Sequence, residues 1–258
     1  MRLSLCAVLM VVASVPVDAQ QSPIVAEANA VYARSESLYR DLHQSPELSG
    51  RETQTAAKLA AELKQLGFEV TSGVGGTGIV GVLKNGAGPA VMLRTELDAL
   101  PVEEKTGLPY ASRVRTKDTN GNDVAVMHAC GHDAHMAAFI GTARIMAGDK
   151  KKWNGTLILV GQPAEETGAG ARAMIADGLF TKFPKPQYAI AVHDDARRVA
   201  GEIGYHAGPI LTNADALDIM IFGRGGHGAR PEATIDPVVI AARTVLALQT
   251  IVSRELSP

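Results

Sequence analysis

Residues Met127–His135 read M-H-A-C-G-H-D-A-H, and this stretch decides how the rest of the chain is interpreted. It holds three imidazoles and a thiol: His128, Cys130, His132 and His135. Apolar residues then recur at the spacing of a core-facing helix, at Met136, Phe139, Ile140, Ala143 and Ala147. The pattern predicts a helix that follows a turn, with Asp133 as its N-cap.

The turn at Cys130 and His132 has the ligand chemistry of a metal site. Free N–H groups at the start of a helix favour an anionic thiolate. Thiolate and neutral imidazole are the ligands that zinc and its first-row neighbours prefer. Satisfied polar side chains beside a core helix are the alternative, and for any one of these residues alone that alternative is better. The close spacing of all four favours a metal.

The composition is that of an ordinary globular protein. The chain has 258 residues, of which 46% are hydrophobic and 20% charged, and its net charge is −2. No basic field points to nucleic acid or to an anionic membrane surface. We therefore expect no nucleic-acid partner.

The first residues predict an export signal. Arg2 precedes an apolar run, Leu3–Val15, and small residues allow cleavage after Ala19. The run is too short to span a bilayer, so we expect no membrane span. A buried N-terminal strand is the alternative. Export to the periplasm or the medium would leave Cys130 as the one thiol, and such a thiol is either a ligand or an inert buried residue.

The first half of the chain predicts helices and short strands. One helix covers residues 24–44, and a second starts at a capping box, Ser49-Gly50-Arg51-Glu52, and ends at Gly67. Strands are expected at Phe68–Thr71 and Ile79–Leu83. The second of these is expected to form a hairpin with Ala90–Arg94.

Apolar strands then end repeatedly in polar residues. Val91–Leu93 leads to Asp98, Thr156–Val160 leads to Glu165 and Glu166, and Tyr188–Val192 leads to His193. Helical patterns separate most of these strands, which predicts an α/β fold with a mostly parallel sheet. Since such sheets carry their sites at the carboxyl ends of the strands, these side chains should meet near the Cys130 turn. Individually, a solvated Glu pair and a capping His are the simpler interpretations.

The pattern of predicted elements changes after Gly204. A strand is expected at Ala216–Phe222, then a glycine-rich loop around His227, then an amphipathic helix over Pro237–Val252. The loop lacks the spacing and the Lys of a phosphate-binding loop.

These residues suit hydrolysis of an amide. A metal held by mixed sulfur, nitrogen and oxygen ligands activates water, and one Glu of the Glu165-Glu166 pair can serve as the base while the other binds. A cysteine hydrolase that uses Cys130 with a nearby His is a second hypothesis, and a non-catalytic remnant is a third.

The chain resembles the metal-dependent amidohydrolases that include aminoacylases, hippurate hydrolases and auxin-conjugate hydrolases, within the co-catalytic metallopeptidase superfamily. The matching segments cover nearly all of the chain after residue 19: Pro46–Leu48, Leu93–Pro101, Met127–His135, Gln162–Glu166, His193, Gly225–His227 and Leu248–Arg254. The resemblance implies a three-layer catalytic domain over residues 20–208, after a signal peptide of residues 1–19. It also implies the start of a ferredoxin-like lid and dimerisation domain over residues 209–258.

The resemblance also implies roles. Cys130, His132, Glu166 and His193 would bind one or two divalent ions (zinc, manganese, nickel or cobalt). Glu165 would be the general base, Asp98 would support the site, and His227 would hold the substrate or its oxyanion. The substrate would be an N-acyl amino acid or a small peptide, and the full-length enzyme a homodimer.

The chain departs from the family pattern in three ways. Glu96 stands where Asp is more usual, and Glu232 stands where many relatives carry His. The second half of the lid and a final ligating His are absent, so we expect this chain to be an N-terminal portion of a longer enzyme. The alternative is that the chain is an inactive truncated fragment.

Overall fold

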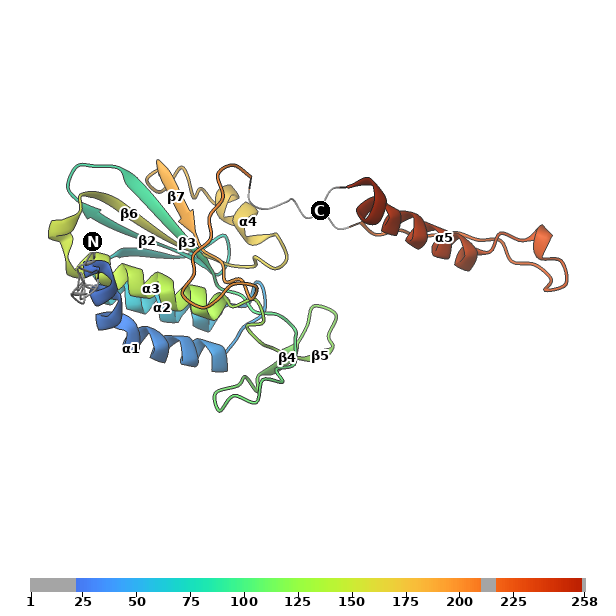
Figure 1. Ribbon diagram of the computed structural model, residues 1–258, viewed down its shortest axis with the longest axis horizontal. Helices are drawn as coiled ribbons and strands as arrows, with labels where there is room; N and C mark the ends of the chain where they lie inside the picture. Colours follow the sequence, from blue (N-terminus) through green and yellow to red (C-terminus); the bar gives the residue numbers. More distant parts are fainter. Residues whose placement is uncertain (1–21, 210–216, 257–258) are drawn as a thin grey trace, which may run out of the picture. The chain divides into compact units, whose positions relative to one another are not determined.

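The computed structural model describes residues 22–209 and 217–256. These residues divide into two compact units, with the division between Arg198 and Val199 (Figure 1). The predicted signal peptide lies outside the described residues. The predicted boundary between residues 208 and 209 stays a prediction.

The first unit is built around a sheet with the strand order β1-β2-β6-β3-β7. Strands β3, β6 and β7 run parallel, β2 is antiparallel to β6, and β1 is antiparallel to β2, so β2 alone is reversed in this sheet. The mostly parallel sheet is therefore confirmed. The elements of this unit are α1 (Pro23–Gln44), α2 (Thr53–Gln65), β1 (Glu69–Val74), β2 (Gly78–Asn85), β3 (Ala90–Glu96), β4 (Arg115–Lys117), β5 (Asp123–Ala125), α3 (His132–Gly148), a short 3-10 helix (Lys150–Lys152), β6 (Gly155–Gln162), α4 (Gly170–Ala176) and β7 (Tyr188–Ala191).

The predicted hairpin between Ile79–Leu83 and Ala90–Arg94 is wrong, because β6 lies between the two strands. Ile158 of β6 pairs with Val82 on one side and with Met92 on the other. The parallel connection from β3 through α3 delivers β6 to the edge of β3 that a hairpin would have used. The hairpin that forms joins β1 to β2, where Val74 pairs with Gly78.

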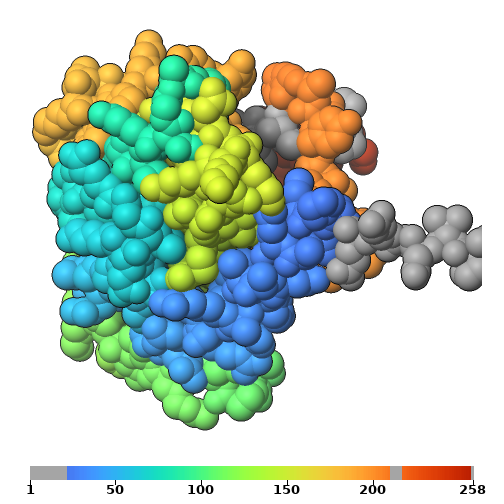
Figure 2. All heavy atoms as spheres, turned by 90° about the vertical axis from the view of Figure 1, so that its left-hand side faces the viewer, coloured from blue at the N-terminus to red at the C-terminus, as the bar shows by residue number. Residues whose placement is uncertain are grey.

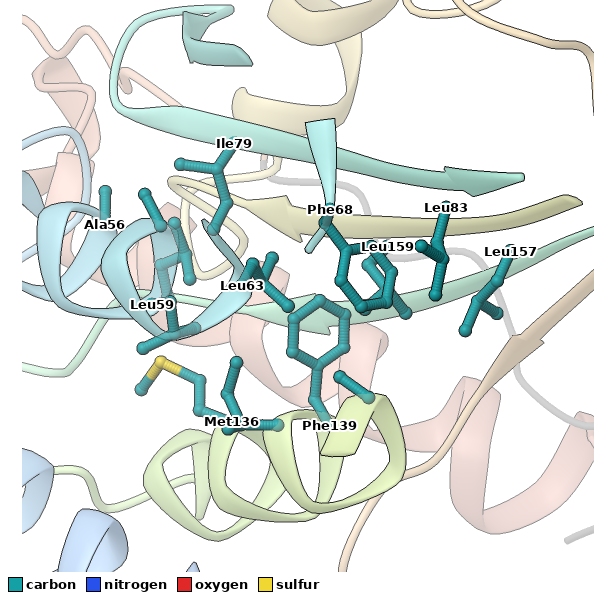
Figure 3. Packing of buried hydrophobic residues seen from close by; sticks show 14 of the residues in the cluster. Ala56, Leu59, Leu63, Phe68, Ile79, Leu83, Met136, Phe139, Leu157 and Leu159 are labelled. Carbon is teal, nitrogen blue, oxygen red and sulfur yellow. The ribbon is translucent and has the colours of Figure 1, made fainter. Parts of the chain in front are cut away.

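Helices cover both faces of this sheet, as the three-layer prediction requires. Alternate residues of β6 point to opposite faces. Leu157 and Leu159 pack with residues of α1, α2 and α3, among them Leu63 and Phe139 (Figure 3), whereas Ile158 and Val160 pack against Met174 of α4. The space-filling view shows α1, in blue, beside the connection that precedes β6, where Lys152 forms an ion pair with Glu27 (Figure 2).

Two helix starts differ from the prediction. Helix α2 begins at Thr53, and the N–H groups of its second and third residues, Gln54 and Thr55, donate to the carboxylate of Glu47 rather than to Ser49. Helix α3 begins at His132, so Asp133 lies inside it, and the preceding Gly131 has a φ of +74°. In both cases a tertiary contact takes the side chain that local pattern assigned to capping.

The second unit contains α5 (Pro237–Thr250), which continues as a π-helix (Ile251–Glu255) and confirms the predicted helix. A short 3-10 helix (Pro231–Ala233) precedes it. Residues 217–222 form no strand, because no described strand lies beside them to complete their hydrogen bonds; Ala216 lies outside the described residues. Helix Pro237–Glu255 is long and apolar enough to cross a membrane by length and composition alone. The ferredoxin-like lid stays a prediction.

Candidate metal centre

The ends of three parallel strands bring the predicted side chains of the first unit together. Asp98 follows β3, Glu165 and Glu166 follow β6, and His193 follows β7. His132, at the start of α3, lies 3.8 Å from Glu165 Oε2 and 3.9 Å from Glu166 Oε1, measured from its Nε2 atom. The Cys130 Sγ atom lies 3.4 Å from His193 Nε2. Strand polarity therefore gathers residues that lie far apart in the sequence.

Asp98 orients His132. The Nδ1 atom of His132 is 2.8 Å from the backbone oxygen of Asp98, so Nδ1 donates and the lone pair on Nε2 faces the Glu pair. Burial lowers the pKa of His132, but hydrogen bonds to Asp98 and the charges of Glu96 and Asp98 outweigh it and raise the pKa to about 9. The surroundings therefore favour a positive charge at Nε2, which a bound cation would supply in place of the proton.

Several buried polar atoms at this edge have no hydrogen-bond partner among the described residues. They are His132 Nε2, Glu166 Oε1, Asp98 Oδ1 and both ring nitrogens of His128. Buried polar atoms are normally paired, so an unpaired cluster of this kind suits a bound water or ion. The separation of His132 Nε2 from Glu166 Oε1 is about twice a zinc–ligand distance of roughly 2.0–2.2 Å. The residues present therefore fit a divalent metal.

The thiol of Cys130 does not behave as the helix start predicts. Burial, followed by the charges of Glu166, Glu165 and Asp194, raises its pKa to about 12. Burial and the carboxylates at the strand ends therefore both disfavour the thiolate. Without a cation the thiol stays protonated, and a cation beside it would reverse that balance.

Two histidine–carboxylate clusters are not predicted from the sequence, although its pattern makes His135 itself a candidate ligand. In the first, His135 contacts Glu96 Oε2 through Nδ1 and Asp194 Oδ1 through Nε2, each at 3.1 Å. Hydrogen bonding to His135 and the charge of Arg94 outweigh burial and lower the pKa of Glu96. Glu96, His132 and His135 form a set close enough to hold an ion, as do His135, His193 and Asp194. The spacing of His135, three residues after His132 on one helix face, was the available signal.

In the second cluster His43 lies between two carboxylates. Its Nδ1 atom is 2.6 Å from Asp133 Oδ2, and its Nε2 atom is 3.1 Å from Glu104 Oε1. The cluster joins α1 and α3 to the loop after β3, and its Asp133 is the residue that follows His132 in the chain. Nothing local in the sequence connects these three positions.

His227 belongs to the second unit. It is exposed in the loop before the 3-10 helix, and its Nδ1 atom accepts a hydrogen bond of 3.1 Å from the Ala229 N–H. Its role at the metal centre stays a prediction.

Comparisons with known proteins agree with this geometry. Residues 92–255 match the model of peptidase family M20/M25/M40. The chain is 40% identical to the hippurate hydrolase of Campylobacter jejuni over 224 residues, which are 86% of this chain and 55% of that protein. It is 39% identical to the N-acetyl-L-cysteine deacetylase of Bacillus subtilis over 222 residues, 86% of this chain and 50% of that protein. The chain thus spans about half the length of these curated relatives.

Solved structures show the same fold. A protein of methicillin-resistant Staphylococcus aureus named as an aminohydrolase matches with a TM-score of 0.73 and 32% identity, over 91% of this chain and 60% of that one. A dinuclear metal binding peptidase of family M20 from Bacillus subtilis matches with a TM-score of 0.57 and 34% identity, over 65% of this chain and 44% of that one. On its sequence match and its fold, this chain belongs to peptidase family M20/M25/M40.

Proposed function

We propose that this chain forms the metal-binding part of an enzyme that hydrolyses the amide bond of N-acyl amino acids or small peptides. The observation that carries the proposal is the buried, unpaired pair of atoms His132 Nε2 and Glu166 Oε1, 3.9 Å apart. The substrate class is supported by the names of the similar proteins, a hippurate hydrolase and an N-acetyl-L-cysteine deacetylase.

In this proposal Cys130, His132, Glu166 and His193 hold one or two divalent ions. Their mixed sulfur, nitrogen and oxygen atoms suit zinc, manganese, nickel or cobalt. A bound ion of this kind supplies Lewis-acid chemistry, lowering the pKa of water and polarising a carbonyl. Asp98 orients two of these residues, since it contacts the His132 ring and also accepts a hydrogen bond from the Glu166 N–H at 3.0 Å.

Glu165 is the proposed general base. Its side chain is partly exposed at 37%, so it can meet both water and substrate. Burial and the negative charge of Glu166 raise its pKa, which makes its carboxylate a better proton acceptor. Glu165 would take a proton from water as the water oxygen bonds to the amide carbon, and would then deliver that proton to the leaving amine as the C–N bond breaks.

The remaining features of the proposal rest on the sequence. His227 is proposed to hold the substrate or its oxyanion, the second unit to mediate a homodimer, and α5 to pack in a lid rather than cross a membrane. Export to the periplasm or the medium is proposed from the residues before Gln20.

The contact between Cys130 and His193 favours one alternative, a cysteine hydrolase. Burial of Cys130 and the carboxylates around it oppose this alternative, because both disfavour the thiolate that such an enzyme needs.

Chelation separates the two mechanisms. The full-length protein is assayed on several N-acyl amino acids before and after dialysis against a chelator, and again after metal is restored. Loss of activity that zinc, manganese, nickel or cobalt restores supports the proposal. Activity that survives chelation but is lost on thiol alkylation would support the cysteine hydrolase, and no turnover in any state would support a non-catalytic remnant.

A further inference from the structure

The turn that carries Glu165 and Glu166 is held by two buried carboxylates. The Ala164 N–H donates to Glu52 Oε1 at 2.8 Å, and the Glu166 N–H donates to Asp98 Oδ2 at 3.0 Å. These two backbone amides flank Glu165. Asp98 already has a place in the proposed site, whereas Glu52 lies 112 residues before the amide that it holds.

Glu52 has no exposed surface, and its carboxylate accepts hydrogen bonds from three positions in the chain. Oε1 accepts from the Gly50 N–H at 2.7 Å as well as from Ala164, and Oε2 accepts from the hydroxyl of Thr77 in the β1–β2 turn. A buried carboxylate is tolerated only when hydrogen bonds satisfy it. The three donors therefore fix the side chain of Glu52 in one position, and Glu52 in turn fixes the backbone at Ala164.

Ala164 needs such a contact. Its φ of +46° makes it the one non-glycine residue with a positive φ among the described residues. L residues rarely adopt this conformation, and it persists only where the surroundings impose it. The Ala164 oxygen is held as well, since it accepts from the Gly170 N–H at 3.1 Å. The next two residues of the chain are Glu165 and Glu166, so the left-handed turn at Ala164 sets the direction in which both carboxylates project.

We propose that Glu52 is a positioning residue that holds the Ala164 turn and thereby sets the distance of Glu165 and Glu166 from His132. The inference rests on the proposed function, since it takes Glu166 as a metal ligand and Glu165 as the base. The reach of Glu52, rather than its charge, performs this role, because both of its backbone partners on Oε1 are neutral amides.

Two substitutions separate reach from charge. Glu52→Gln keeps an oxygen at the same reach, and its amide can donate to the Thr77 hydroxyl. Glu52→Asp keeps the charge but is one methylene too short to hold Gly50 and Ala164 together. Cobalt titrations of the full-length protein should give a native dissociation constant for Glu52→Gln within about threefold. Glu52→Asp should weaken binding by about tenfold or more and change the visible spectrum of the bound cobalt.

Glu47→Asp is the matched control. Glu47 lies in the same segment and caps α2 through Gln54 and Thr55, but it makes no hydrogen bond to the Ala164 turn. This variant should lower the unfolding midpoint and leave cobalt affinity unchanged. Adding Ala164→Gly to Glu52→Asp should restore part of the affinity, because glycine adopts positive φ freely.

Native cobalt affinity in Glu52→Asp, or a loss in Glu52→Gln as large as that in Glu52→Asp, would overturn the proposal. Hydrogen exchange gives a second measurement should Glu52→Asp fail to fold: the Ala164 amide of the native protein should be protected like the amides of β6, and rapid exchange would refute the contact. A native protein that binds no metal would contradict the proposed function, while the exchange measurement would still report on Glu52.

Discussion

The Nε2 atom of His132 and the Oε1 atom of Glu166 face each other across 3.9 Å, and neither has a hydrogen-bond partner among the described residues. Both atoms are buried. Asp98 contacts the ring of one residue and the N–H of the other. One aspartate at the end of β3 thus sets the separation of two proposed ligands.

The two members of the Glu pair should fail differently. Glu166→Gln should lower the metal content of the full-length protein, because it removes an anionic ligand. Glu165→Gln should leave metal bound while kcat falls by on the order of a hundredfold or more, because it removes the base. Metal analysis and steady-state kinetics on the same preparations check this, and equal metal loss in both variants would contradict the assignment.

The metal affinity of Cys130 variants should depend on the charge of the new side chain. Cys130→Asp restores an anionic ligand, whereas the hydroxyl of Cys130→Ser stays protonated near neutral pH. Metal titration should therefore find weaker binding in the serine variant. A serine variant that binds as tightly as the aspartate variant would remove Cys130 from the set of ligands.

The His43 cluster predicts a stability that depends on pH. Burial lowers the pKa of His43, but hydrogen bonds to Glu104 and Asp133 outweigh it, so the folded pKa lies above the usual value of about 6.5. The charged imidazole therefore stabilises the fold fully below about pH 6.5, and this contribution is lost as the pH rises through the folded pKa.

Urea unfolding in the presence of a chelator tests this dependence. The difference in unfolding free energy between the native protein and His43→Gln should shrink as the pH rises above about 6.5. A difference that stays constant with pH would show that folding does not shift the pKa of His43, and a difference that grows with pH would show that the fold holds the imidazole neutral; either result would contradict the account.

The core should be sensitive at Leu63, which is fully buried against α3 and the sheet. Leu63→Ala should lower the free energy of unfolding by about 2–5 kcal/mol, because it removes packed methyl groups and leaves a cavity. Ile24→Ala, at an exposed position at the start of α1, is the control and should change this free energy little. Similar losses in both variants would argue against this core.

The sequence predicts the site better than it predicts the order of the strands. Asp98, Glu166 and His193 each follow an apolar strand, and parallel strands direct their carboxyl ends to one edge, so their meeting point follows from polarity alone. The false hairpin arose because the short connection between Ile79–Leu83 and Ala90–Arg94 indicates only local chemistry. The insertion of β6 depends on the crossover through α3, which no local pattern encodes.

The missed residues share one physical property. Glu52, Glu104 and His43 are polar side chains whose partners lie far along the chain: Glu52 binds the Ala164 amide, and His43 binds Glu104 from 61 positions away. Ser49 similarly looked like a cap for α2, but its hydroxyl donates to Asp98 at 2.6 Å. Capping and periodicity describe near neighbours, so buried polar contacts of this range appear only once the fold is assembled.

An anomalous difference map of crystals of the full-length protein, loaded with zinc, tests the central claim most directly. The account predicts a peak between His132 and Glu166, about 2.0–2.2 Å from His132 Nε2 and from a Glu166 oxygen, with Cys130 Sγ about 2.3 Å away if both bind the same ion. A map with no peak at this edge of the sheet, or with zinc bound only elsewhere, would contradict it.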